Sequence, residues 1–179
     1  MSFDVANTSV ERITITIERV EVVVTRDPVV VVLPPDFVDA MKKDDAGLGP
    51  LCGWGDPELE PTSETVSDTI LSAARRDPEF ERASIFAAYA TTNETNATRL
   101  LVGLVFGIAY AKHAEVNLLC AKRRERMGVG TALLEAFERD AGKPYVTVAP
   151  TRDATKFYEG RRYVRYDDDD AETTLFKRF

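Results

Sequence analysis

The feature that most constrains the fold of this chain is a strand-like segment that leads through a glycine-containing turn into a helix. The apolar residues 116–121 end just before residues 122–126, which contain four cations and one anion and so carry a local charge of +3. Gly128-Val-Gly130 follows and opens a helical pattern. Glycine lets a ligand approach the backbone, and the first amides of a helix have no partner within it, so this turn could hold a phosphate. An ordinary basic turn before a helix is the alternative interpretation.

The segment Glu125-Arg-Met-Gly128-Val-Gly130 and the later segment Ala154-Thr-Lys-Phe-Tyr158-Glu resemble two motifs of the GNAT superfamily of acetyl-CoA-dependent N-acetyltransferases. The family pattern of the first motif is Q/R-x-x-G-x-G/A, and this chain has Glu125 where the family has Gln or Arg. The second motif is A-x-x-L/F-Y-E, often with Asn three residues before it and Gly-Phe after it. This chain has Thr151 and Arg162-Tyr163 at those places.

The resemblance covers about residues 83 to 179 and implies an α/β (α+β) architecture, the GNAT fold. Such a fold has a central, mixed and mostly antiparallel sheet, flanked by helices and splayed after the fourth core strand, here after Cys120. We expect residues 1–179 to form a single GNAT N-acetyltransferase domain. Residues 83–179 would be the acetyl-CoA-binding core, and residues 1–82 would be a divergent N-terminal part that builds the acceptor pocket.

The resemblance also implies which residues bind acetyl-CoA. They lie in the strand before the loop, in the loop and the first helical turn, and around the later helix: Leu118, Leu119, Cys120, Arg124, Glu125, Arg126, Met127, Gly128, Val129, Gly130, Thr131, Thr151, Ala154, Phe157 and Tyr158. A carboxylate repels a diphosphate, so Arg124 or Arg126 would have to compensate for Glu125.

Acetyl transfer to an amine needs a neutral nucleophile and a stabilised thiolate. A lysine-like amine has a pKa of ~10.4 and is mostly protonated at neutral pH, so a general base is useful. Glu115 resembles the general base that nuclear histone acetyltransferases of the superfamily carry on the strand before the loop; the alternative is an outward-facing strand residue. Tyr158 would donate a proton to sulfur, or else be a packed aromatic residue. His113, the only histidine, could act as a base, but its place in a turn predicts an exposed side chain.

The amino-acid composition limits which kinds of molecule this chain is expected to bind. The 179 residues contain 23 Lys and Arg against 30 Asp and Glu, a net charge of −7, which argues against nucleic acid and favours cationic acceptors. Cys52 and Cys120 make neither a disulfide framework nor a metal motif, and Cys120 is expected to be a small buried residue. The run Asp167–Asp170 is interpreted as a solvated turn rather than a metal site. Without a leader or an apolar span, we expect a soluble cytoplasmic protein that does not bind membranes, as a monomer or homodimer.

Hydrophobic periodicity and turn residues predict the elements along the chain. They are a strand over 12–24, an apolar run over 29–33, a helix over 36–42, a loop over 44–61, a helix over 63–76 capped by Ser63, an antiparallel meander of 83–91, 99–112 and 114–121, a helix ending near Ala141, a strand over 145–149, a helix over 153–159, and a hairpin of 162–166 with 173–178.

These observations favour an enzyme that transfers an acetyl group from acetyl-CoA to a primary amine by direct attack in a ternary complex. The acceptor would be a small amine, a polyamine, or a protein lysine or N-terminus. A non-catalytic module of the same fold, binding CoA or a protein partner, is the alternative. A nucleotide-binding protein fits less well, because the third glycine and the Walker Lys-Ser/Thr pair are absent.

Overall fold

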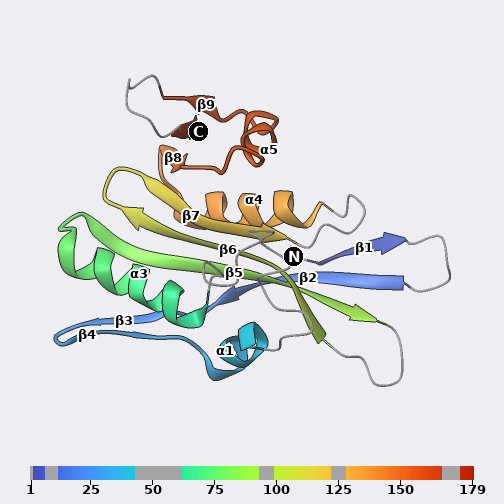
Figure 1. Ribbon diagram of the computed structural model, residues 1–179, viewed down its shortest axis with the longest axis horizontal. Coiled ribbons are helices and arrows are strands. Elements are labelled where there is room, and N and C mark those ends of the chain that lie inside the picture. The colour runs from blue at the N-terminus through green and yellow to red at the C-terminus, as the bar shows by residue number, and fades with distance from the viewer. Residues whose placement is uncertain (1, 7–11, 43–61, 93–98, 122–127, 167–173) are drawn as a thin grey trace.

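The computed structural model describes residues 2–6, 12–42, 62–92, 99–121, 128–166 and 174–179 (Figure 1). The described strands form an eight-stranded sheet in the order β1-β2-β5-β6-β7-β8-β10-β9 and a separate two-stranded sheet of β3 and β4. The strands of the large sheet are β1 (Ser2–Ala6), β2 (Arg12–Val20), β5 (Phe80–Thr92), β6 (Arg99–Tyr110), β7 (Ala114–Ala121), β8 (Tyr145–Val148), β9 (Val164–Arg165) and β10 (Leu175–Arg178). All neighbours except β7 and β8 pair antiparallel.

Helices cover both faces of this sheet, as Figure 1 shows. Helix α4 (Val129–Ala141) packs on one face, while α1 (Pro35–Lys42) and α3 (Ser63–Arg76) pack on the other. The short helix α5 (Thr155–Glu159) follows β8 on the side of α4. This arrangement confirms the predicted mixed α/β architecture with a mostly antiparallel sheet.

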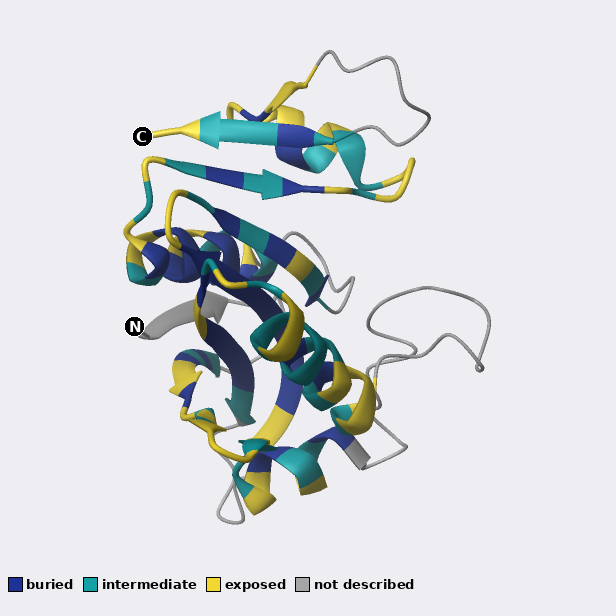
Figure 2. Cartoon of the chain, turned by 90° about the vertical axis from the view of Figure 1, so that its left-hand side faces the viewer, coloured by how far each residue is buried: buried dark blue, intermediate teal, exposed yellow. Residues whose placement is uncertain are grey.

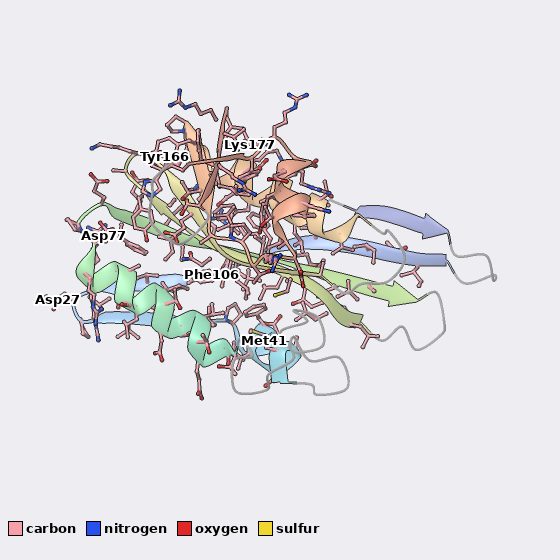
Figure 3. All side chains as sticks on the ribbon, turned by 45° about the horizontal axis from the view of Figure 1, so that its top comes forward. Asp27, Met41, Asp77, Phe106, Tyr166 and Lys177 are labelled. Atoms are coloured by element: carbon pink, nitrogen blue, oxygen red, sulfur yellow. The ribbon has the colours of Figure 1, made fainter. Side chains whose placement is uncertain are left out.

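The sheet separates two hydrophobic cores. One contains Leu133 and Phe137 of α4, and the other contains Phe37 and Met41 of α1 with Ile70 of α3. Figure 3 shows side chains filling the space on both sides, with Met41 on the α1 side and Lys177 among the C-terminal strands. Burial of apolar surface on two faces is the main driving force for such a layered fold.

Strand β6 lies in the middle of the sheet and is buried from Leu101 to Tyr110. Figure 2 shows that the central strands of the sheet are largely dark blue, which marks buried residues. A strand buried on both faces is apolar along its whole length instead of alternating. A Cβ atom on Gly107 would lie 2.4 Å from the ring of Phe137, so only glycine lets α4 approach the sheet this closely.

Strand β7 pairs with β8 over three residues only, from Ala114 to Val116. Beyond Val116, β6 is the only described strand that pairs with β7. The register on β6 also shifts there: Gly107 pairs with Val116 and Phe106 with Leu118, which leaves Asn117 as a bulge. The pairing of β7 with β8 therefore ends before Cys120, the residue after which the splaying was predicted.

A buried carboxylate ties the C-terminal strand to α4. Glu138 is 8% exposed and accepts hydrogen bonds from Lys177 Nζ at 2.8 Å and from the Tyr163 hydroxyl at 2.9 Å. A buried charge is tolerated when it is paired and hydrogen-bonded in this way.

The predicted meander and the long helices are confirmed, but several boundaries differ. The predicted strand over 12–24 is wrong at its end, because β2 stops at Val20 and β3 (Val23–Arg26) pairs with β4 (Val29–Val32) instead. Helix α3 is capped by Thr62 rather than Ser63: the Thr62 side chain accepts from the amide of Thr65 at 3.1 Å.

Further findings concern the ends of the chain. Strand β1 was not predicted. The predicted terminal hairpin is confirmed, because β9 and β10 pair antiparallel, and β10 also pairs with β8. The loop over 44–61 and the Asp167–Asp170 run lie outside the described residues. None of the helices in the described part of the chain is both long and apolar enough to cross a bilayer.

Candidate active site

Gly128 is the N-cap of α4 and adopts a left-handed conformation with φ 69° and ψ 6°. Non-glycine residues rarely adopt this conformation, so the glycine is required by the turn itself. A Cβ atom built on Gly128 would find no described atom within 4 Å. That turn contains no acidic residue, and its amides carry the positive end of the helix dipole.

The first turn of α4 contacts both the end of β7 and helix α5. A Cβ on Gly130 would lie 3.5 Å from the ring of Phe157 and 3.7 Å from Cβ of Ala121. The fold therefore brings three segments of the predicted cofactor site together: the end of the strand, the glycine turn and the later helix. Val129, at 3% exposed, anchors this turn in the core.

Other predicted cofactor residues play supporting roles in this region. The Thr151 carbonyl accepts the amide of Ala154 at 2.9 Å and so shapes the turn before α5. Leu119 packs on the α4 side of β7, and Leu118 packs on the α3 side. Cys120 is 3% exposed, as expected, but it is disulfide-bonded, so the prediction that the cysteines form no disulfide framework is wrong. The predicted positions Arg124, Glu125, Arg126 and Met127 lie outside the described residues.

Tyr158 lies in the core on the α4 side and is 4% exposed. Its ring makes edge contacts with Phe157 and Tyr163, with ring centroids 5.1 Å and 5.3 Å apart. Burial raises the pKa of the Tyr158 hydroxyl, and the nearby Arg161 only partly offsets this effect. The hydroxyl is therefore protonated at neutral pH, so it can donate a proton but cannot accept one.

Arg162 occupies the place where the family often has glycine, and it adopts φ 69°. The backbone adopts the left-handed conformation that glycine would favour, although this conformation is strained for an arginine. The turn directs the chain so that the amide of Tyr163 donates to the carbonyl of Tyr158 at 3.2 Å. Arg162 is thus the only non-glycine residue with positive φ in the described part of the chain.

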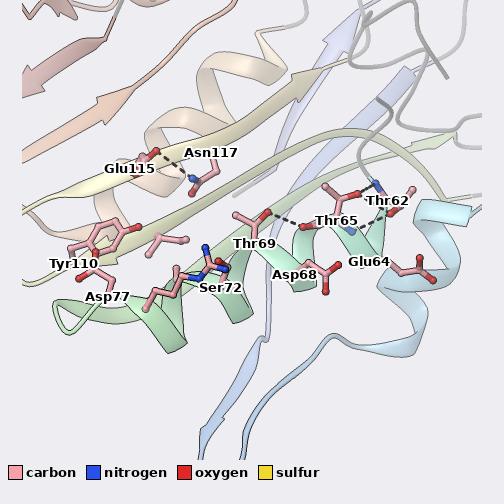
Figure 4. A pocket seen from close by; sticks show the side chains of 13 residues that line it. Thr62, Glu64, Thr65, Asp68, Thr69, Ser72, Asp77, Tyr110, Glu115 and Asn117 are labelled. Carbon is pink, nitrogen blue, oxygen red and sulfur yellow. Dashed lines mark hydrogen bonds between the residues drawn. The ribbon is translucent and has the colours of Figure 1, made fainter. Parts of the chain in front are cut away.

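A groove of about 770 Å³ runs along α3 on the opposite face of the sheet (Figure 4). Residues of α3 and its flanks form one wall, and β6 and β7 contribute Ile108, Tyr110, Glu115 and Asn117 to the other. Its described lining contains four carboxylate side chains, those of Glu64, Asp68, Asp77 and Glu115, and one guanidinium, that of Arg76. Such a lining attracts cations.

Glu115 lies on the wall of this groove and not on the open surface. Burial raises the pKa of its carboxyl, while the charge of His113 acts in the opposite direction. The side-chain amide of Asn117 donates to Glu115 Oε1 at 3.4 Å, as Figure 4 shows. A partly buried carboxyl with a raised pKa is a better proton acceptor near neutral pH than an ordinary glutamate.

His113 is not the exposed turn residue that the sequence suggested. Its ring stacks between those of Tyr110 and Tyr145, with centroids 4.9 Å and 5.4 Å away. His113 directly precedes β7, and its charge acts on the Glu115 carboxyl. The stacking partners come from β6 and β8, which no local sequence pattern could have brought together.

Arg161 is a residue of this region that the sequence analysis missed. Its guanidinium stacks on the ring of Phe157, with Cζ 3.7 Å from the centroid, and Nη1 donates to the Phe157 carbonyl at 2.8 Å. Nη2 donates to Oγ1 of Thr131 in the first turn of α4. The spacing of four residues between Phe157 and Arg161 is the helical spacing for such a contact, and was the available signal.

Within the described residues, no group of three or more His, Cys, Asp or Glu side chains is arranged to hold a metal ion. Glu115 and Tyr158 do not meet on one surface: Glu115 faces α3, and Tyr158 belongs to the core beneath α4. They lie on either side of the sheet, and Glu115 is still within the stretch of β7 that pairs with β8.

Comparisons by sequence give no match: no protein-family model and no curated protein matches this chain. Solved structures do match. An acetyltransferase from Streptococcus agalactiae aligns over 92% of this chain and 98% of its own, with a TM-score of 0.57 and 14% identity. The PaiA N-acetyltransferase from Thermoplasma acidophilum, solved in complex with coenzyme A, aligns over 92% and 99%, with a TM-score of 0.52 and 12% identity. At such identities the likeness concerns the fold.

Proposed function

We propose that this chain, whose fold is that of GNAT-type acetyltransferases, transfers an acetyl group from acetyl-CoA to a primary amine. The observation that carries this proposal is the meeting of the β7 end, the Gly128 turn and α5 at one end of α4. On the other side of the sheet, a groove with four carboxylates offers a place for a cationic acceptor.

The residues present fit a CoA molecule. The Gly128 turn and the amides of the first turn of α4 suit a diphosphate. Strand β7 has no described partner on its β8 side from Asn117 onward, and an unpaired strand edge binds extended groups that contain amides. The pantetheine arm of CoA is such a group. Acetyl-CoA would supply the acetyl group as a thioester.

Glu115 would accept the proton that the attacking amine must lose. The amine nitrogen would form a bond to the acetyl carbon, and the bond from that carbon to sulfur would break. The raised pKa of the Glu115 carboxyl brings it closer to neutral pH, where a general base is most effective. Asn117, which donates to Glu115, would hold the carboxylate in place.

The Tyr158 hydroxyl would give a proton to the departing sulfur. The hydroxyl is protonated at neutral pH, although burial raises its pKa and so makes it a weaker acid than an ordinary tyrosine. Its ring is held between Phe157 and Tyr163, so the hydroxyl would be directed by packing rather than by a flexible side chain. Exchange with solvent would then restore the protonated tyrosine and the ionised glutamate.

The groove favours an amine that is cationic in solution. The four carboxylates outnumber the one guanidinium, so the groove would attract the protonated, cationic form of the acceptor amine to the neighbourhood of Glu115. The bound amine would then lose its proton before it attacks. The hydroxyls of Thr65 and Thr69 also line the groove and could bind polar groups of the acceptor.

Two measurements test the proposal. In a thermal-shift comparison, acetyl-CoA should raise the Tm and ATP should not, because ligand binding to the native state stabilises it. Release of free CoA should then be followed with polyamines, amino acids, aminoglycosides and histone peptides as acceptors. A protein stabilised by acetyl-CoA that acetylates no amine would instead be the CoA-binding module without turnover, and a protein that acetyl-CoA does not stabilise would contradict the proposal.

A further inference from the structure

His113 and Glu115 lie on the same face of the sheet, although His113 precedes the first residue of β7. Ile108 and Tyr110 of β6 both belong to the hydrophobic core on the α3 side. Glu115 pairs with Ile108, and both residues line the groove. The ring of His113 stacks on that of Tyr110, whose amide donates to the His113 carbonyl at 2.8 Å. Two residues of extended chain span about 6.6 Å, a separation that one water molecule can bridge.

The imidazole of His113 is held in place by stacking. Its ring lies almost parallel to the rings of Tyr110 and Tyr145, with interplanar angles of 18° and 7°. No described residue forms a hydrogen bond or an ion pair with this imidazole. Stacking covers the two faces of the ring and leaves both nitrogens, which lie at its edge, available for proton exchange. The side chain is half-buried, so solvent reaches it.

Glu115 needs a route for its proton after each turnover. In the proposed reaction, the carboxylate takes a proton from the amine, and the acetylated product then occupies the groove beside it. Burial raises the pKa of the Glu115 carboxyl, so the carboxyl gives up its proton less readily than an ordinary glutamate. A histidine is well suited to take that proton, because imidazole exchanges protons near neutral pH.

We propose that His113 relays this proton from Glu115 to solvent through a bridging water. The inference rests on the proposed function and adds a residue that acts through the general base without touching the acceptor. The O–H bond of the Glu115 carboxylic acid breaks while an N–H bond forms on the neutral imidazole, and the water between them gives up one proton as it gains another. The imidazolium then loses its proton to bulk water. The carboxylate and the neutral imidazole are both restored, and one proton leaves the protein.

The charges around this pair favour the relay. The surrounding titratable and charged side chains are those of Tyr110 on β6, Tyr145 on β8, Lys112 and Lys143 near the turn, and Glu64, Asp68, Arg76 and Asp77 on the α3 side of the groove. Both lysines form ion pairs, Lys112 with Glu79 and Lys143 with Glu81. In the groove the carboxylates outnumber the single guanidinium, so their field would stabilise the imidazolium as it forms.

The test follows acetylation of an amine that the wild type accepts, in a weakly buffered solution. His113→Phe keeps a ring for the stack but has no nitrogen. Lys112→Gln is the matched control, because it removes a charge from a neighbouring side chain that is 75% exposed. We expect His113→Phe to lower kcat about tenfold, less than the loss of a general base itself, and to leave the acceptor KM and the Kd for CoA unchanged. Lys112→Gln should change none of these.

Added imidazole distinguishes a relay from a structural role. It should restore the kcat of His113→Phe by carrying the proton, after subtraction of the rate without protein, and should leave wild type and Lys112→Gln unchanged. His113→Gln is a second variant, in case the phenylalanine disturbs the turn, and the same loss and rescue are expected of it.

An unchanged kcat in both variants would overturn the inference and leave the proposed function intact. A loss of kcat that imidazole does not restore would also overturn it, because His113 would then only support the fold around Glu115. A wild-type protein that acetylates no amine would instead refute the proposed function, and the relay with it.

Discussion

Replacement of Gly128 by asparagine tests the cofactor turn most directly. The backbone there has φ 69°, and a left-handed conformation costs an ordinary residue about 1–2 kcal/mol. Loss of glycine also reduces the entropy of the unfolded chain, which returns about 0.4–1 kcal/mol. Alanine at this position should therefore lower the free energy of unfolding by about 1 kcal/mol, and asparagine by less, because its side chain tolerates this conformation. For a chain of this length, 1 kcal/mol corresponds to about 2–4 °C in Tm.

The effect on CoA binding should be larger than the effect on stability. Because no described atom lies within 4 Å of an added Cβ, the asparagine side chain would enter the space in front of the first helical amides. We expect the Kd for CoA, measured by calorimetry, to rise at least tenfold, which is about 1.4 kcal/mol. Valine is a poorer choice, since a β-branched residue would strain the left-handed turn further.

Gly142 offers a matched control at the other end of the same helix. It has φ 59°, and its nearest contact for an added Cβ is the Asp140 carbonyl at 3.9 Å. Gly142→Asn should therefore shift the Tm about as much as Gly128→Asn and leave the Kd for CoA unchanged. The reasoning is refuted if a folded Gly128→Asn protein binds CoA as tightly as wild type, or if both variants weaken binding equally.

Three further variants test other parts of the site. Tyr158→Phe should lower kcat by about 10²–10⁴ with little change in the Kd for CoA, because it removes one hydroxyl from a packed ring; a retained kcat would make Tyr158 a packing residue. Glu115→Gln should raise the Tm at neutral pH. Burial raises the pKa of the Glu115 carboxyl in the native state, so the wild-type protein keeps its full stability below the pKa of an ordinary glutamate and loses stability as the pH rises through the native pKa. This difference should vanish in acid, and a constant difference across pH would contradict it. Arg162→Gly should raise the free energy of unfolding in urea by about 0.5–1 kcal/mol by relieving the left-handed arginine, and a loss would show that its side chain contributes more than its strain costs.

The sequence predicted the parts of the fold that depend on local periodicity. The apolar residues of β6 and the amphipathic pattern of α4 identified the central strand and its covering helix, and Gly142 correctly marked the helix end through its left-handed conformation. The break between β2 and β3 was missed, because Glu21 and Val22 contain no glycine or proline and continue the β-branched pattern. At this point the chain leaves the large sheet because β3 pairs with β4, and this pairing depends on residues outside β2.

The candidate site was predicted less completely than the fold. The motif residues Gly130 and Phe157 do lie together, as the resemblance implied. The groove beside Glu115, in contrast, depends on how α3 packs against β4 and β5, and the sequence carries no signal for which strand a helix will face. The stacking of His113 and the contact between Arg161 and Thr131 join residues from different elements, so periodicity alone could not have predicted them.

The bulge at Asn117 makes β7 tolerant of a change in its length. Ala114 and Val116 face α4 before it, Leu119 faces α4 after it, and Asn117 has no counterpart on β6. Removing this one residue would restore strict alternation and leave every flanking side chain on its present face. Relatives of this chain could therefore have or lack the bulge residue, a difference of one codon, without any repacking of either core. Its loss would, however, straighten the strand and remove the side-chain amide that donates to Glu115, so such relatives should hold the carboxylate at this position differently.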